Sequence, residues 1–151
     1  MPNTPALIGE GMSALYANAK TSAKQKKTAG ELLQAAGKII WVKDESLMDV
    51  VTAISGSGPA YVFLFLQSLI EAGISHGLPK DISNQLGVQT LLGSAKLLEA
   101  LQEPIEKLRL DVTSKGGTTE AALSVLMKKG GLKDLIDDAV GKAVKRAKEL
   151  A

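Results

Sequence analysis

The sequence contains no cysteine and only one histidine, and these two shortages exclude several kinds of active site. Without cysteine there is no disulfide, no thiol nucleophile and no thiolate metal site. His76 alone cannot build a zinc site, and it stands between Ser75 and Gly77 at the predicted end of a helix. A structural role is favoured for it over catalysis, and no metal is expected.

Aromatic residues and net charge are also scarce, which narrows the fold class and the partners. Aromatic residues make up 3% of the 151 residues, so aliphatic side chains must form the core, and this composition favours helices over sheets. The formal net charge is +2, and the basic clusters are short, as on solvated helix faces. We therefore expect no nucleic-acid partner. The N-terminus has no recognisable signal peptide, so we expect a cytoplasmic protein.

Helical periodicity covers most of the chain. Capping boxes are predicted at Ser22 with Gln25 and at Ser46 with Asp49. Residues 1–9 are predicted to be extended, and the β-branched segment 38–43 is a strand candidate without an identified partner strand. The predicted helices cover residues 10–18, 22–36, 46–54, 58–76, 81–101, 105–110, 120–128 and 132–150.

The segment from Val50 to Ile70 carries no formal charge and is long enough to span a bilayer. The glycine-rich motif at residues 55–59 is predicted to break it into two elements, so burial in protein is favoured over lipid. The helix from Tyr61 to Ile70 has no polar face, and a helix that is apolar all round must be surrounded. A subunit interface is the predicted place for it.

Residues 111–119 form the stretch with the strongest chemical signal. Gly116 and Gly117 precede two threonines and a helical pattern, so backbone N–H groups can turn toward an anion at a helix start. A plain loop with a threonine cap is the alternative for this pattern. The motif at residues 55–59 lacks the third glycine and the βαβ setting of a dinucleotide fingerprint, so no nucleotide site is expected in this chain.

Four segments in this order and spacing resemble pyrroline-5-carboxylate reductases: residues 1–5, 52–61, 77–79 and 112–119. The resemblance covers the whole chain. It implies an all-α helical bundle, like the C-terminal domain of 6-phosphogluconate dehydrogenase, that forms an interlocked homodimer or a larger assembly. It also implies reduction of 1-pyrroline-5-carboxylate to L-proline with NADPH or NADH, bound mainly by an N-terminal Rossmann domain.

The same resemblance implies roles for individual residues. The loop that holds the substrate matches Ser114, Gly116, Gly117, Thr118 and Thr119. The amides of residues 117–119 would hold the substrate carboxylate, and Thr119 would hydrogen-bond the ring nitrogen as the catalytic proton donor or imine orienter. Three further positions match the substrate or cofactor surroundings: Glu45 near the substrate, and Asp111 and Asn3 near the cofactor. A turn residue between prolines is an equally supported role for Asn3.

The sequence departs from the family pattern in three places. Lys115 stands where proline is commoner, and either Glu99 or Glu103 could take the place of an acidic residue found in some members. The chain begins where the Rossmann domain should already have ended, so we expect residues 1–151 to form one helical domain. That domain was either excised or is encoded by a separate short gene, and the chain alone should be inactive. The alternative is a non-catalytic dimerisation or carboxylate-binding module of the same fold.

Overall fold

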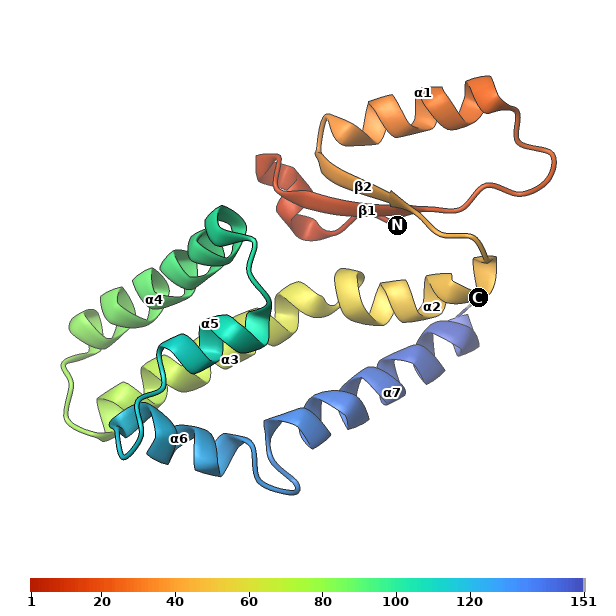
Figure 1. Ribbon diagram of the computed structural model, residues 1–151. Helices are drawn as coiled ribbons and strands as arrows, with labels where there is room; N and C mark the ends of the chain where they lie inside the picture. The colour runs from red at the N-terminus through yellow and green to blue at the C-terminus, as the bar shows by residue number, and fades with distance from the viewer. Residues whose placement is uncertain (151) are drawn as a thin grey trace. The chain divides into compact units, whose positions relative to one another are not determined.

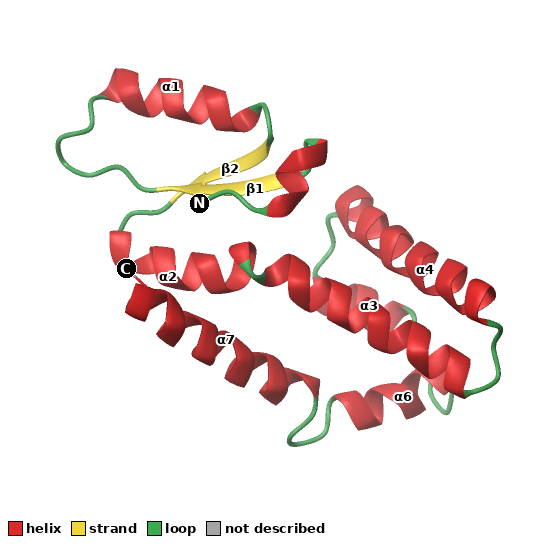
Figure 2. Cartoon of the chain, turned by 180° about the vertical axis from the view of Figure 1, so that it is seen from behind, coloured by secondary structure: helices red, strands yellow, loops and turns green. Residues whose placement is uncertain are grey.

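The computed structural model describes residues 1–150, which divide into two compact units (Figure 1). The first unit consists of Met1–Val62 and the C-terminal segment from Ile136, and the second of Phe63–Leu135. The helices are α1 (Ala23–Gln34), α2 (Met48–Val51), α3 (Gly58–Ser75), α4 (Lys80–Leu101), α5 (Ile105–Asp111), α6 (Thr118–Leu126) and α7 (Leu132–Leu150). Two short strands are the exception in an otherwise helical chain (Figure 2), so the all-α prediction is confirmed.

Most of the predicted helix boundaries are confirmed. Ser22 and Gln25 form the expected capping box, in which the Gln25 N–H donates to the Ser22 hydroxyl at 3.3 Å and the Gln25 side chain accepts from the Ser22 N–H at 2.8 Å. Two orphan donors of α1 are satisfied in this way. The predicted box at Ser46 is wrong, because Asp44 caps this turn instead and accepts from the Ser46 N–H at 2.9 Å.

The N-terminal segment of the first unit differs from the prediction. Strand β1 (Gly11–Leu15) occupies the place of the helix predicted at residues 10–18, and a 3-10 helix (Thr4–Ile8) replaces the extended start. Strand β1 pairs in parallel with β2 (Gly37–Trp41), the predicted strand, and α1 connects the two. Ser13, Ala14 and Leu15 are buried in β1, so tertiary packing outweighs the local helical preference.

The glycine-rich motif at residues 55–59 separates two helical elements, as predicted. The first element ends with a π-helix (Thr52–Gly56), a bend follows at Ser57, whose N–H donates to the Thr52 carbonyl at 2.9 Å, and α3 begins at Gly58. Taken together, residues 45–75 form one long helical stretch with this bend in it. By length and composition alone this helix could cross a membrane. Only 6% of its apolar window is buried within the described residues, and an exposed apolar surface of this size is typical of an interaction site.

In the second unit, α3 and α4 form a hairpin around small residues. The Ser83 hydroxyl donates to the Ile70 carbonyl at 2.8 Å, and a Cβ on Gly87 would lie 2.8 Å from Ile70 Cγ1. Among residues 63–135 no large hydrophobic side chain is buried, and Phe63 and Leu64 are 66% and 63% exposed. A unit without an apolar core of its own gains most of its stability by association.

Candidate functional site

The loop between α5 and α6 folds into a tight turn that is held by hydrogen bonds to backbone carbonyl groups. The Gly117 N–H donates to the Ser114 carbonyl at 3.0 Å, and the Thr113 hydroxyl donates to the Arg109 carbonyl at 2.6 Å. Gly116 has φ +73°, a left-handed conformation that favours glycine. A Cβ on Gly117 would lie 2.4 Å from Ser114 Oγ and 3.0 Å from the Ser114 carbonyl oxygen, so a side chain at this position would displace the Ser114 hydroxyl.

The turn leaves a set of donors at the start of α6. Gly117 is the N-cap of this helix and has no side chain to accept from the first-turn amides. The N–H groups of Thr118 and Thr119 therefore have no partner within the helix and can meet an anion. The Gly117 amide was also predicted to hold the ligand, but it is used by the turn itself.

Three hydroxyl groups surround these amides. Ser114 and Thr118 are exposed, and Thr119 is partly buried. The five loop residues named from the sequence thus occupy one short stretch, in which amide and hydroxyl donors accompany the positive end of a helix dipole. This combination suits a small carboxylate with a second polar atom nearby.

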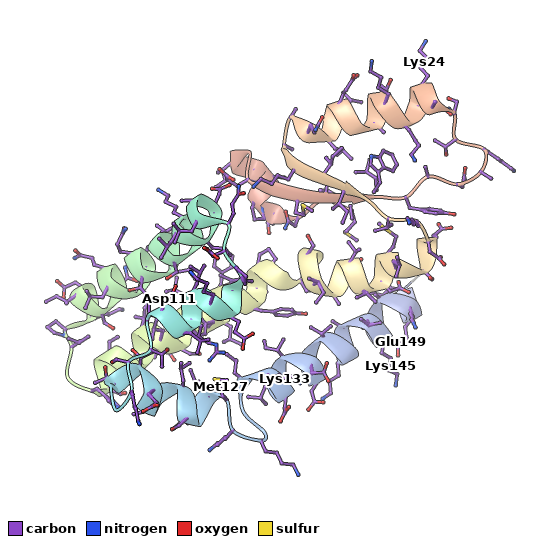
Figure 3. All side chains as sticks on the ribbon, in the orientation of Figure 1. Lys24, Asp111, Met127, Lys133, Lys145 and Glu149 are labelled. Carbon is purple, nitrogen blue, oxygen red and sulfur yellow. The ribbon has the colours of Figure 1, made fainter. Side chains whose placement is uncertain are left out.

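Asp111 is the last residue of α5 (Figure 3). Its carboxylate forms an ion pair with Lys107. Lys107 Nζ is 3.3 Å from Asp111 Oδ2 and 3.5 Å from Glu103 Oε1. Both pairs are exposed and join residues four positions apart, and such pairs contribute little to stability. Glu99 belongs to α4, and the choice between Glu99 and Glu103 as the acidic residue near the substrate stays open.

Asn3 belongs to the first unit and uses its whole side chain internally. Its Nδ2 donates to the Ser55 carbonyl at 3.2 Å and to the Ser55 hydroxyl at 3.3 Å, and its Oδ1 accepts from the Met12 N–H at 2.9 Å. Asn3 thereby links β1 to the π-helix. Cofactor binding and the alternative, a turn residue between prolines, both stay predictions for Asn3.

Glu45 also belongs to the first unit, at the start of a 3-10 helix (Glu45–Leu47). Its side chain is exposed, and its neighbour Asp44 caps the turn. Hydrogen bonds from the backbone and the side chain of Ser46 hold the pKa of Asp44 below its usual value, because they favour the charged carboxylate. The substrate contact predicted for Glu45 stays a prediction.

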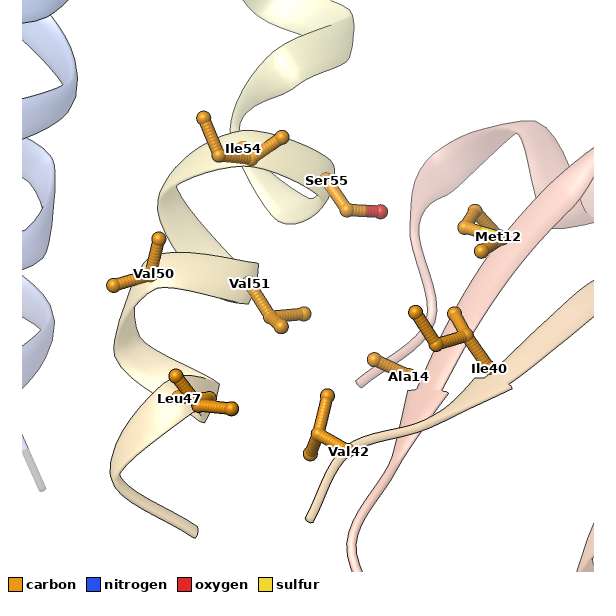
Figure 4. A pocket seen from close by; sticks show the side chains of 9 residues that line it. All are labelled: Met12, Ala14, Ile40, Val42, Leu47, Val50, Val51, Ile54 and Ser55. Atoms are coloured by element: carbon orange, nitrogen blue, oxygen red, sulfur yellow. The ribbon is translucent and has the colours of Figure 1, made fainter. Parts of the chain in front are cut away.

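A cavity of about 380 Å³ lies in the first unit between the sheet and the helical segment that follows it (Figure 4). Its side chains come from β1, from β2 and the residue after it, from the 3-10 helix (Glu45–Leu47), from α2 and from the π-helix, and Ser55 is the only polar one among them. An apolar cavity without a charged group cannot hold a carboxylate well. The loop before α6 is therefore the better candidate for the site.

Strand β1, α1 and β2 form a βαβ unit, an arrangement that can bind dinucleotides when the turn after its first strand is glycine-rich. The connection from β1 to α1, residues 16–22, contains no glycine, so its backbone lacks the glycine-rich turn that cradles a pyrophosphate. Residues 1–150 thus do not fit a complete dinucleotide site.

The fold is that of a helical protein whose exposed apolar faces are typical of a dimerisation domain. The chain belongs to the pyrroline-5-carboxylate reductase dimerisation family, whose model matches residues 45–150. It is 48% identical over its full length to the pyrroline-5-carboxylate reductase of Pseudomonas aeruginosa and 38% identical to that of Pisum sativum.

Solved structures give the same result. The chain superposes over its full length on 56% of the pyrroline-5-carboxylate reductase of Coxiella burnetii, with a TM-score of 0.93 at 42% identity. It also matches 60% of the Plasmodium falciparum reductase, solved with NADP bound, with a TM-score of 0.89 at 38% identity. The chain spans about half the length of the curated relatives it matches, 55% of the Pseudomonas aeruginosa protein. The family resemblance given by the four sequence segments is confirmed.

One residue of the loop was missed by sequence reasoning. Glu120 Oε2 accepts a hydrogen bond from the Gly116 N–H at 2.7 Å, across four positions of the chain. The only sequence signal for it is an acidic residue in the first turn of a helix, and that signal is common because acidic residues favour helix N-termini.

Proposed function

We propose that this chain supplies the substrate-holding and dimer-forming part of a pyrroline-5-carboxylate reductase. The observation that carries the proposal is the loop before α6, which presents two free amides and three hydroxyl groups. The family to which the chain belongs supports the same function. A pure scaffold has no need of such donors. The substrate would be 1-pyrroline-5-carboxylate and the product L-proline.

The carboxylate of the substrate would lie against the N–H groups of Thr118 and Thr119. An anion is stabilised there by the unpaired amides and by the helix dipole together. The Ser114 hydroxyl, three residues before the N-cap, can donate a further hydrogen bond. This assignment explains why the glycine pair and the hydroxyl residues occur in one loop.

Thr119 would orient the ring nitrogen and supply or relay its proton. Reduction of the C=N bond adds a hydride to carbon and a proton to nitrogen, so a hydroxyl placed at nitrogen can follow the change in charge. The hydride would come from NADPH or NADH, held by a nucleotide-binding part that these residues do not supply. Asn3 and Asp111 would lie near the cofactor, and Glu45 would lie near the substrate.

The second part of the proposal is a homodimer, from which a larger assembly can be built. The apolar side chains of α3 and α4 are exposed within the chain, and burying one such side chain contributes about 1.5–3 kcal/mol. A second copy would cover them with protein, which we favour over a lipid environment for the helix at residues 45–75. We place this dimer in the cytoplasm. The extent of one helical domain over residues 1–151 stays a prediction, since the family match is confined to residues 45–150 and two strands precede it.

The proposed function is tested by restoring the nucleotide-binding part. The N-terminal portion of the Pseudomonas aeruginosa reductase is joined to this chain, and NADPH oxidation with 1-pyrroline-5-carboxylate is followed. We expect turnover by the fusion and none by the chain alone. No turnover by a folded, NADPH-binding fusion would contradict the proposed activity.

Two further measurements separate the enzyme from the alternative, a non-catalytic dimerisation or carboxylate-binding module. Light scattering should give the mass of a dimer, and a monomer would contradict the second part of the proposal. L-proline should shift the amide resonances of Gly116, Gly117, Thr118 and Thr119 in a saturable titration. Binding without turnover in the fusion would favour the carboxylate-binding module.

A further inference from the structure

The bond between Glu120 and Gly116 fixes the shape of the loop before any ligand binds. Glu120 is the third residue of α6, and its carboxylate reaches back to the N–H of a glycine with φ +73°. The Gly116 N–H therefore already has an acceptor and is not available to a ligand. The free donors are those that follow it, at the first positions of the helix.

The same bond recurs once more in the second unit, which gives an internal control. Gly130 has φ +74°, and its N–H donates to Asp134 Oδ2 at 2.6 Å, again four positions along the chain. The Gly131 N–H donates to the Lys128 carbonyl at 2.8 Å, as the Gly117 N–H does to the Ser114 carbonyl. A carboxylate that holds the left-handed glycine is thus part of how this chain builds a glycine-pair turn.

We propose that Glu120 is a positioning residue of the substrate loop and acts through the Gly116 amide. By holding Gly116 in its left-handed conformation, Glu120 keeps the turn of residues 114–117 in the form that opens the amides of Thr118 and Thr119. The inference rests on the proposed function, because it assumes that these amides hold the substrate carboxylate. Asp134 holds an equivalent turn without the hydroxyl residues and should not affect ligand binding.

The hydrogen bond between Glu120 and Gly116 keeps the loop in its binding conformation before the ligand binds, and this determines how much affinity its removal should cost. A loop that is released must be ordered on binding, which lowers affinity without changing the contacts made. Loss of one hydrogen bond of this kind corresponds to a roughly threefold to tenfold weaker affinity. The Glu120→Gln variant would keep an acceptor oxygen for the Gly116 N–H, so it should restore what alanine removes.

The experiment measures L-proline affinity by NMR titration of the full chain and of its variants Glu120→Ala, Glu120→Gln and Asp134→Ala. We expect Glu120→Ala to weaken the affinity about threefold to tenfold and to speed hydrogen exchange at the Gly116 amide. Glu120→Gln should stay within about twofold of the unaltered chain. Asp134→Ala should speed exchange at Gly130 and leave the L-proline affinity unchanged.

The outcomes distinguish the inference from the proposed function. Unchanged affinity in Glu120→Ala, or a Glu120→Gln variant as weak as Glu120→Ala, would overturn the positioning role alone. Equal weakening in Asp134→Ala would also overturn it, since the effect would then be one of general stability. No L-proline binding by the unaltered chain would overturn the proposed function, and the role of Glu120 with it.

Discussion

Two glycine-pair turns of the second unit have almost the same backbone hydrogen bonds but different side chains. In each, a left-handed glycine is followed by a second glycine whose N–H bonds to a carbonyl three residues back, and a helix begins at the next residue. In each, an acidic residue in the first helical turn accepts from the first glycine. The turns at residues 114–120 and 128–134 are thus one device used twice.

The difference between them lies in the side chains. The first turn carries Ser114, Thr118 and Thr119, and the equivalent positions of the second are Lys128, Leu132 and Lys133. Both turns present free amides at a helix start, but only the first surrounds them with neutral hydroxyl donors. The glycine pair therefore builds the turn, and the hydroxyl residues make the first turn a candidate site.

The largest effect is expected from removing the hydroxyl of Thr119. Thr119→Val keeps the shape of the side chain and should lower kcat of the active fusion about 100-fold, because the proton at the ring nitrogen loses its donor. Steady-state NADPH oxidation measures this. Lys133→Val changes the equivalent position of the second turn and should leave kcat unaltered.

If kcat of Thr119→Val stays within a few-fold of that of the unaltered fusion, the Thr119 hydroxyl does not distinguish the first turn from the second in catalysis. The proton would then come from another group or from water. The L-proline titration of the same variant separates this from a binding defect, since the amides that hold the carboxylate remain.

Alanine at the second glycine should have a different effect in each turn: it should lower stability in the second turn and weaken L-proline binding in the first. A Cβ on Gly131 would lie 2.4 Å from the Leu126 carbonyl oxygen and 2.7 Å from that of Lys128, and neither can rotate away. Gly131→Ala should therefore lower the free energy of unfolding by about 2–3 kcal/mol. At Gly117 the closest atom is the Ser114 hydroxyl at 2.4 Å, which can rotate to another position.

Gly117→Ala should accordingly cost about 1 kcal/mol of stability or less, and yet weaken L-proline binding about tenfold because Ser114 is displaced. Urea unfolding at one fixed protein concentration measures the first quantity, since a dimer's stability depends on concentration. The reverse order, with Gly117→Ala the less stable variant, would contradict this difference between the turns.

The sequence was sufficient to name the loop but not its internal bonds. Gly116, Gly117 and Thr119 are local signals, because a glycine pair before hydroxyl residues and a helix predicts free amides in any fold. The engagement of the Gly117 amide and of Glu120 depends on backbone angles that residue types do not specify. The recurrence at Gly130 was present in the sequence as a helix break, and its equivalence to the site became visible only in the hydrogen bonds.

The fold shows the same division between local and distant causes. The helices were predicted because caps and apolar periodicity lie within each segment, as at Ser22 for α1. Strand β1 was mistaken for a helix because its partner β2 lies beyond α1 in the sequence, and parallel pairing leaves no local turn signal. The apolar side chains that follow Tyr61 are exposed within the chain, and their burial at a subunit interface stays a prediction from composition alone.

The smallest effect is expected at the position three residues before each N-cap. Ser114→Ala removes one exposed hydroxyl and should weaken L-proline binding about twofold to fivefold, the range of a single hydrogen bond that water can partly replace. Lys128→Ala removes the equivalent side chain of the second turn and should leave binding unaltered. Both positions are exposed, so the free energy of unfolding should change by less than about 0.5 kcal/mol in either variant. If Lys128→Ala weakens binding as much as Ser114→Ala, the ligand responds to the charge of the surface rather than to the hydroxyl, and the distinction between the two turns is lost.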